Sequence, residues 1–211
     1  MGNKKIKCVI VSGAPDQDYD FLKNRLHEDA YIIAADSGYL KCIKAGFVPD
    51  LIIGDFDSSE YPEMDTEIIR LPAEKDFTDT FTCVKKAVDM GFSEIELLCA
   101  IGNRADHNYA NMLCLDYCRK HNVKCVISNR HNRIQLVKNE ITINGSEYKY
   151  FSVYAFLGTV EGLTIKDAYY AVNHIALQPS DQFAQSNCFK NNMPVKISVQ
   201  SGIILLIQSN D

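Results

Sequence analysis

The first 128 residues alternate short apolar runs with segments of helical periodicity. The apolar runs are short, and most lack the polar alternation of a half-exposed strand, so we expect strands buried on both faces. Strands that alternate with helices at this spacing indicate a parallel α/β sheet. The predicted strands cover residues 6–12, 31–35, 51–53, 67–71, 94–100 and 123–128.

Four helices are expected between these strands, over residues 19–28, 37–45, 80–90 and 107–120. The second and third are followed by Gly46 and Gly91, the residue type that most often ends a helix. For the last helix, the pattern predicts a buried face made of Ala110, Leu113, Cys114 and Tyr117.

The pattern changes after residue 129, where short strand-like runs follow one another without an amphipathic helix. Turn-forming pairs such as Asn144-Gly145 separate them, which indicates a small antiparallel sandwich or barrel. The predicted fold is therefore an α/β domain with a mostly parallel sheet over 1–128, then an all-β sandwich or barrel-like domain over 134–211. The predicted strands are 134–138, 140–143, 148–156, 163–165, 168–171, 175–177, 195–199 and 203–208.

Composition places the chain among ordinary globular proteins. Its 211 residues include 22 Lys and Arg against 27 Asp and Glu, a net charge of −5, which disfavours a nucleic-acid partner. The apolar run 8–11 is too short for a signal peptide, and no run approaches a membrane span. The eight cysteines contain no CxxC pair. We therefore expect a soluble, cytoplasmic protein with reduced thiols and no membrane partner.

The clearest candidate chemistry is a pair of aspartates, Asp55 and Asp57, directly after the strand at 51–53. Ligands of parallel α/β sheets bind at the carboxyl ends of strands. Two neighbouring carboxylates there suit a hard cation such as Mg²⁺. An ordinary surface turn with solvated aspartates remains the alternative.

Other strand ends also carry charged residues. Asp36 follows the second strand, Lys75 and Asp79 follow the fourth, and Arg104 and Asp106 follow the fifth. Helix capping is a competing explanation for Asp36 and for Asp79, which has capping-box spacing from Asp76. Mg²⁺ held by carboxylates and substrate phosphates would explain the whole set. Neither a GxxxxGK[ST] loop nor a GxGxxG loop is present.

These segments resemble the thiamine pyrophosphokinase family. The resemblance rests on GDFDSS at 54–59, PAEKDFTD at 72–79 and IGNRADHNYAN at 101–111, with GLT at 162–164 and Ser186-Asn187 further on. It implies an α/β nucleotide domain, a β-sandwich, and a homodimer whose active sites lie between subunits. The implied reaction converts ATP and thiamine into AMP and thiamine diphosphate, with Mg²⁺ as the cofactor.

The resemblance also implies roles for individual residues. It places Asp55, Asp57 and Asp79 at the catalytic Mg²⁺–triphosphate site, with Asp36 near the same phosphates. Lys75, Arg104 and Asp106 fall on positions that line the nucleotide and acceptor cleft, and Ser186 and Asn187 on the segment that closes over thiamine. Asn103 and Cys188 depart from the family pattern, and the chain has no Trp.

Two other functions stay open at this point. A haloacid-dehalogenase-type phosphatase also places a D-x-D motif after a strand, although there it usually follows the first strand. A non-enzymatic Mg²⁺–nucleotide sensing module would use the same acids for binding alone.

Overall fold

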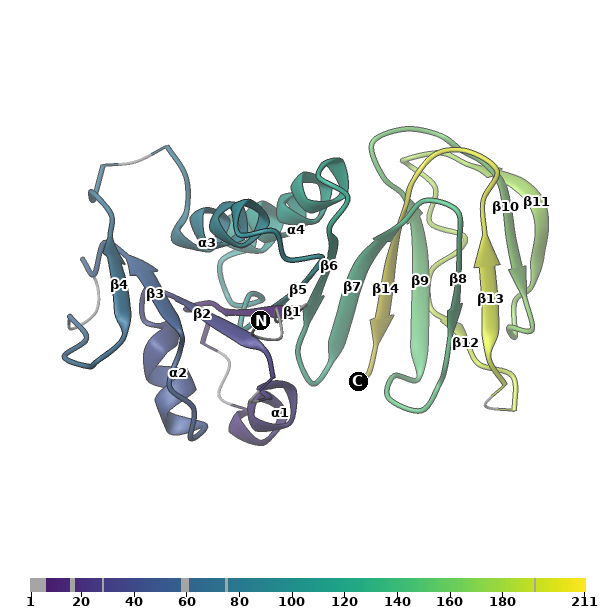
Figure 1. Cartoon of the computed structure of the whole chain (residues 1–211). Helices are drawn as coiled ribbons and strands as arrows, with labels where there is room; N and C mark the ends of the chain where they lie inside the picture. Colours follow the sequence, from purple (N-terminus) through teal and green to yellow (C-terminus); the bar gives the residue numbers. More distant parts are fainter. Residues whose placement is uncertain (1–6, 16–17, 28, 58–60, 75, 192) are drawn as a thin grey trace, which may run out of the picture. The chain divides into compact units, whose positions relative to one another are not determined.

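The computed structural model describes residues 7–15, 18–27, 29–57, 61–74, 76–191 and 193–211. The chain divides into two compact units, Met1–Arg130 (unit 1) and His131–Asp211 (unit 2). Unit 1 contains the helices, and unit 2 is built from strands (Figure 1). The predicted fold class, an α/β part followed by a β-rich part, is confirmed.

Unit 1 has a parallel sheet with the strand order β6-β5-β1-β2-β3-β4. From β1 the chain first builds outwards through β2, β3 and β4, and then returns to place β5 on the other side of β1. Such a reversal of strand order leaves a crevice at the carboxyl ends of the two central strands. The strands are β1 (Lys7–Val11), β2 (Tyr31–Ala35), β3 (Leu51–Gly54), β4 (Glu67–Arg70), β5 (Glu94–Leu98) and β6 (Lys124–Ser128).

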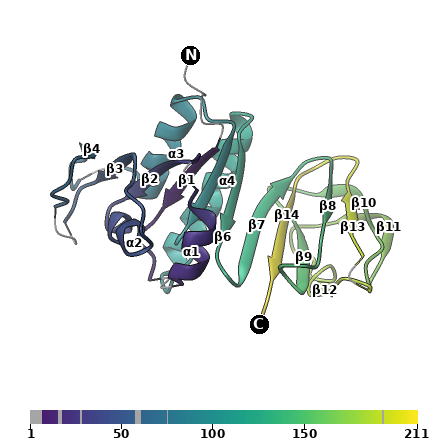
Figure 2. The ribbon, with the colours of Figure 1, turned by 60° about the horizontal axis from the view of Figure 1, so that its bottom comes forward.

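Helices cover both faces of this sheet. The helices α1 (Tyr19–Arg25) and α2 (Gly38–Lys44) lie on one face, and α3 (Asp79–Asp89) and α4 (Ala105–Lys120) lie on the other (Figures 1 and 2). Since both faces are covered, β1, β2, β3 and β5 are almost wholly buried. Of the described helices, none is long and apolar enough to span a membrane.

Two sequence predictions about burial in unit 1 are wrong. β4 is exposed at both ends and only half-buried between them, because it is the edge strand and pairs with β3 alone among the described strands. Leu113 of α4 is 42% exposed, and of the predicted buried face only Cys114 is buried. Besides Cys114, the buried residues of α4 are Asn111, Leu115, Asp116 and Cys118. The hydrogen bonds and ion pairs of Asn111 and Asp116 allow these two polar residues to be buried.

Unit 2 is a sandwich of two antiparallel sheets, with strand orders β12-β9-β14-β7 and β11-β10-β13-β8. Buried aliphatic and aromatic side chains from both sheets form its core. The predicted strand at 168–171 is wrong, because Ala168 makes only an isolated bridge to Phe189, and β12 was not predicted. The strands are β7 (Asn132–Val137), β8 (Glu140–Ile143), β9 (Tyr150–Ala155), β10 (Val160–Lys166), β11 (Val172–Leu177), β12 (Asn187–Cys188), β13 (Val195–Ser198) and β14 (Ile204–Ser209).

All eight cysteines are free thiols, and seven of them are buried. Burial raises the pKa of Cys42 and of Cys114 to about 12. Thiols with such pKa values are protonated and unreactive at neutral pH, so these cysteines act as small apolar core residues.

Candidate active site

A cleft of about 420 Å³ lies where the strand order of unit 1 reverses. Two loops form much of its wall: residues 12–15 after β1 and residues 99–104 after β5. The amide N–H of Ser12 donates to Leu98 O and that of Ala14 to Cys99 O, at 2.9 and 3.0 Å, so the two loops are tied together. The cleft is therefore at the position where parallel α/β sheets bind their ligands.

The backbone takes an unusual conformation at the ends of three strands of this sheet. Asp36 after β2, Phe56 after β3 and Cys99 after β5 all have positive φ, at 46°, 58° and 51°. This left-handed conformation is unfavourable for residues with a side chain, most of all for a bulky one. Such conformations concentrate at functional sites, where the surrounding fold holds them in place.

Asp36 and Asp79 both line the cleft. Other residues occupy the helix-capping positions that were the alternative explanation for these two acids. The Thr78 hydroxyl caps α3 by accepting from Phe81 N–H at 3.2 Å, and the N-cap of α2 is Ser37. Asp36 and Asp79 are therefore not the N-cap residues of these helices, although Asp79 is the first residue of α3 and lies in its first turn.

Asp55 and Asp57 lie on the loop after β3, next to the cleft rather than among the residues that line it. The backbones of β3 and Asp36 meet closely, since a Cβ added to Gly54 would lie 2.9 Å from the Asp36 Cα. The Asp57 amide donates to the Asp55 carboxylate at 3.2 Å, which fixes the turn between them. Asp55 is half-buried and Asp57 is exposed.

Arg104 and Asp106 form an exposed ion pair at the mouth of the cleft. The Arg104 Nη2 donates to Asp106 Oδ2 at 2.6 Å, and its Nε donates to Asp106 Oδ1 at 3.2 Å. Hydrogen bonding from Arg104 lowers the pKa of Asp106 to about 2, and the same bonds raise the pKa of Arg104. Arg104 lines the cleft, whereas Asp106 is not among the lining residues and bonds to the guanidinium from outside the cleft.

Three polar residues of the cleft, Thr80, Asn108 and Asn111, were not predicted as site residues. The Thr80 hydroxyl donates to the Ser12 hydroxyl at 3.0 Å on the buried floor. Asn108 and Asn111 of α4 also line the cleft and bond to the backbone of the loop after β5. Their signal in the sequence is two asparagines three residues apart, which share one face of a helix.

The donors at this edge of the sheet fit Mg²⁺ bound together with a nucleotide. In the part of the chain that the structure describes, no three His, Cys, Asp or Glu side chains form a group that could hold a metal ion. Carboxylates are nevertheless the hard oxygen ligands that Mg²⁺ takes, and one or two of them often suffice when substrate phosphates supply the rest. The arrangement suits a cation that arrives with its phosphates.

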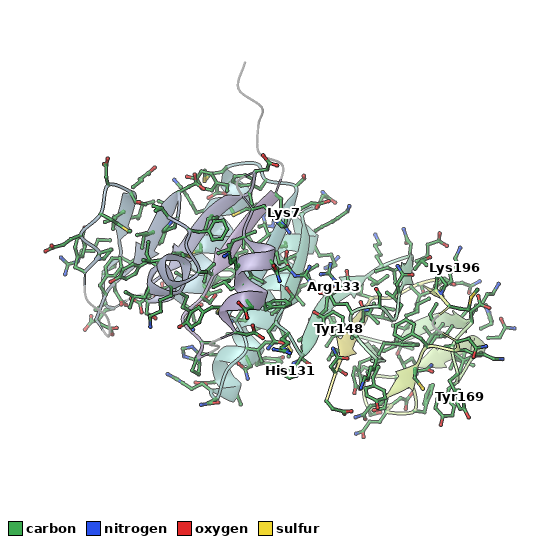
Figure 3. All side chains as sticks on the ribbon, turned by 90° about the horizontal axis from the view of Figure 1, so that it is seen from below. Lys7, His131, Arg133, Tyr148, Tyr169 and Lys196 are labelled. Carbon is green, nitrogen blue, oxygen red and sulfur yellow. The ribbon has the colours of Figure 1, made fainter. Side chains whose placement is uncertain are left out.

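Three further predicted site residues lie elsewhere. Lys75 is outside the described residues. Ser186 and Asn187 belong to unit 2, where Ser186 is exposed with φ 53°. The buried Asn187 side chain accepts from Tyr170 N–H at 3.0 Å and donates to Tyr170 O at 2.7 Å. It thereby holds a segment in which the neighbouring Tyr169 is 65% exposed at the rim of unit 2 (Figure 3).

Two protein-family models match the chain. One, described as thiamin pyrophosphokinase, catalytic domain, matches residues 22–127, half of the chain. The other, thiamin pyrophosphokinase, vitamin B1 binding domain, matches residues 138–204. The first match contains the residues that line the cleft from Ala35 onwards. The second match contains Ser186 and Asn187.

Individual relatives agree with the family models. The chain is 28% identical to the thiamine pyrophosphokinase of Bacillus subtilis over 210 residues, which cover 96% of this chain and 98% of that protein. The crystal structure of thiamine pyrophosphokinase from Bacillus subtilis matches with a TM-score of 0.87 at 25% identity, covering 97% and 99% of the two chains. That of thiamin pyrophosphokinase from Geobacillus thermodenitrificans matches with a TM-score of 0.83 at 26% identity, covering 97% and 98%.

Nothing in these comparisons supports the phosphatase or the sensing module. The chain belongs to the thiamine pyrophosphokinase family, the enzymes that transfer pyrophosphate from ATP to thiamine.

Proposed function

We propose that the cleft of unit 1 binds the triphosphate of ATP and is the place where this chain transfers pyrophosphate to thiamine. One observation carries this proposal. Asp36, Asp79 and Arg104, which follow three different strands, line one cleft where the strand order reverses. Phosphate groups need cationic and hydrogen-bonding partners, and carboxylates beside them are explained by a bridging cation.

Asp55, Asp57 and Asp79 would hold Mg²⁺ through their carboxylates. When bound, the cation neutralises charge on the polyphosphate and lowers its repulsion of an incoming oxygen. Asp36 is suited to a place beside the same phosphates, because it lines the cleft and lies against the end of β3.

Arg104 would contact the phosphates directly, with Asp106 and Lys75 as further members of the nucleotide and acceptor cleft. A guanidinium presents a rigid fork of donors that matches phosphate oxygens. Asp106 holds that fork in place before the nucleotide arrives, through two hydrogen bonds.

The reaction is an in-line substitution at the β-phosphorus of ATP. A bond forms between the thiamine hydroxyl oxygen and the β-phosphorus, while the bond from that phosphorus to the oxygen of AMP breaks. The hydroxyl proton passes to an aspartate of the cleft and then to water. Positioning and charge stabilisation by the chain supply most of the acceleration, as in phosphoryl transfer generally.

Unit 2 would supply the thiamine contacts, with Ser186 and Asn187 on the segment that closes over the substrate. Asn187 would support this segment indirectly, because its buried side chain bonds to the backbone of Tyr170. We infer a homodimer in which unit 2 of one protomer completes the site of its partner. The inferred location is the cytoplasm, where the eight free thiols would stay reduced, with no nucleic-acid or membrane partner.

A product assay tests the proposal. Purified protein is incubated with ATP and Mg²⁺, with and without thiamine, and AMP and phosphate are quantified by chromatography. The proposal requires AMP release that depends on thiamine. Phosphate release without thiamine would indicate a phosphatase, and the absence of turnover would leave a binding module.

A further inference from the structure

We propose that Asn108 is a positioning residue for nucleotide binding: it fixes the loop after β5 so that Arg104 is held at the wall of the cleft. This role rests on the proposed function of the cleft. The Asn108 side chain makes two hydrogen bonds to a single residue of that loop. It accepts from Gly102 N–H at 2.8 Å and donates to Gly102 O at 2.8 Å.

The paired bonds fix both the position and the direction of the Gly102 backbone. Bonding to both the N–H and the C=O of one residue requires an acceptor and a donor, and a side-chain amide carries the two on neighbouring atoms. The amide N–H of Asn108 also donates to Arg104 O at 3.0 Å. That bond is the ordinary main-chain bond between residues four apart at the start of α4, so the side chain of Asn108 acts on the loop at Gly102, two residues before Arg104.

Asn111 supports the same loop one turn further along α4. Its side chain donates to Ala100 O at 2.7 Å and is 7% exposed. Asn108 and Asn111 therefore bond to the loop at Gly102 and at Ala100, from one face of the helix. These bonds to the loop explain why α4 carries asparagines on this face, where apolar residues would be expected.

Besides its exposed ion pair with Asp106, Arg104 depends on the position of its loop backbone. Arg104 is the N-cap of α4 and makes no side-chain capping bond, and residues 103–107 are exposed. On its other side the loop packs tightly on the wall of the cleft, since a Cβ at Gly102 would lie 2.8 Å from Pro15 Cδ and 3.0 Å from Ala14 Cβ. Releasing Gly102 would therefore move the wall of the cleft together with Arg104.

A double-mutant cycle tests whether Asn108 acts through Arg104. The variants are Asn108→Leu, Arg104→Leu and the double variant, with Asn24→Leu on an exposed position of α1 as the control. For each, kcat/KM for ATP, the Kd for Mg–ATP and the melting temperature are measured. Asn108→Ala replaces Asn108→Leu in the cycle if the leucine variant does not fold.

We expect Asn108→Leu to lower kcat/KM for ATP by about tenfold or more and to weaken Mg–ATP binding, because a misplaced contact loses much of its effect. The double variant should be no worse than Arg104→Leu, since the two residues act as one unit. Asn24→Leu should match the unmodified protein.

Two results would overturn the role of Asn108. One is unchanged ATP kinetics in folded Asn108 variants, and the other is losses that multiply in the double variant. An unmodified protein that forms no thiamine diphosphate would instead refute the proposed function, so the two failures are distinguishable.

Discussion

At the cleft, individual residues occupy conformations that the local sequence alone would not choose. Asp36 and Phe56 lie in the left-handed region, which costs about 1–2 kcal/mol for a residue with a side chain. The amide N–H of Asp36 donates to Ile53 O at 2.9 Å, so the neighbouring strand fixes the turn that carries the carboxylate. Tertiary structure thus holds this acid in the wall of the cleft.

Replacing Asp57 by Asn should abolish turnover while the fold is kept. The substitution removes one anionic ligand from a site that needs hard charged donors and leaves the shape almost unchanged. We expect kcat to fall by at least about 10²-fold. The control is Asp65→Asn, an exposed acid of the same unit. Near-normal turnover of a folded Asp57→Asn protein would exclude Asp57 from the Mg²⁺ site.

Glu96 is a buried acid in the middle of the unit 1 sheet, 4% exposed. Lys7 of β1 (Figure 3) and Ser128 of β6 each donate to its carboxylate at 2.6 Å, and Arg25 lies 3.9 Å away. Burial by itself raises the pKa of Glu96, but these hydrogen bonds and charges outweigh it and hold the pKa below the ordinary value of 4.5.

This geometry predicts an acid-sensitive contribution to stability. Because the folded-state pKa is lowered, the contribution is complete above the unfolded-state pKa and is lost as pH falls through the folded-state value. We expect Glu96→Gln to lower the free energy of unfolding by about 2 kcal/mol at pH 7, and the difference to shrink below about pH 4.5.

Urea unfolding at several pH values measures this contribution, with Glu94→Gln as the control on the same strand. Glu94 pairs with an exposed Lys124 at 3.1 Å, and exposed pairs contribute about 1 kcal/mol or less. A Glu96→Gln difference that stays constant down to low pH would contradict the assignment.

At the scale of elements, α2 depends on a close approach to β1. A Cβ on Gly38, the first residue of α2, would overlap the carbonyl oxygen of Val11. At Gly13 the nearest obstacle is the Ser37 hydroxyl at 2.8 Å, a side chain that can rotate away.

We therefore expect Gly38→Ala to destabilise unit 1 by about 2–3 kcal/mol, because backbone must move. Gly13→Ala should cost about 1 kcal/mol or less by the same reasoning. Chemical unfolding of both variants gives the comparison. Equal effects would show that α2 and β1 do not meet as closely as the structure has them.

The hydrophobic pattern predicted the strands and helices of unit 1 well, but it predicted less well which of their residues are buried. All six strands and four helices are present with small shifts at their ends, since buried strands and helix-stopping glycines leave clear local signals. The buried face of α4 was misassigned because Asn111 is buried by bonding to Ala100 O, in the loop after β5. β12 was missed because a two-residue strand has no periodicity.

The candidate site could also be predicted only in part, because some of its residues owe their position to contacts with distant parts of the chain. Asp36, Asp79 and Arg104 follow strands, and the rule for strand ends places them together. Asn108 could not be found in that way, because its role depends on where Gly102 lies in space. Asp55 and Asp57 were expected at the same edge of the sheet, and the loop after β3 holds them beside the cleft.

For the whole molecule, the proposed division of labour between the two units predicts complementation. The acids of the cleft belong to unit 1, whereas Ser186 belongs to unit 2. In a two-fold symmetric dimer each interface creates two equivalent sites. If those sites are shared between protomers, a dimer of an Asp57→Asn chain and a Ser186→Trp chain has one site with both lesions and one site with neither.

Mixing the two inactive variants under subunit exchange should therefore restore about a quarter of the unmodified activity at equal concentrations, assuming random pairing. Mass spectrometry of the mixed dimers verifies the exchange. If exchange is verified and activity does not return, each chain builds its own site.

The most direct test of the central claim is a ³¹P NMR time course of the protein with ATP, thiamine and Mg²⁺. Transfer of pyrophosphate in the unit 1 cleft predicts that AMP and thiamine diphosphate appear at equal rates as ATP disappears, without ADP. Formation of ADP with thiamine monophosphate, or of free phosphate in place of the thiamine ester, would contradict it.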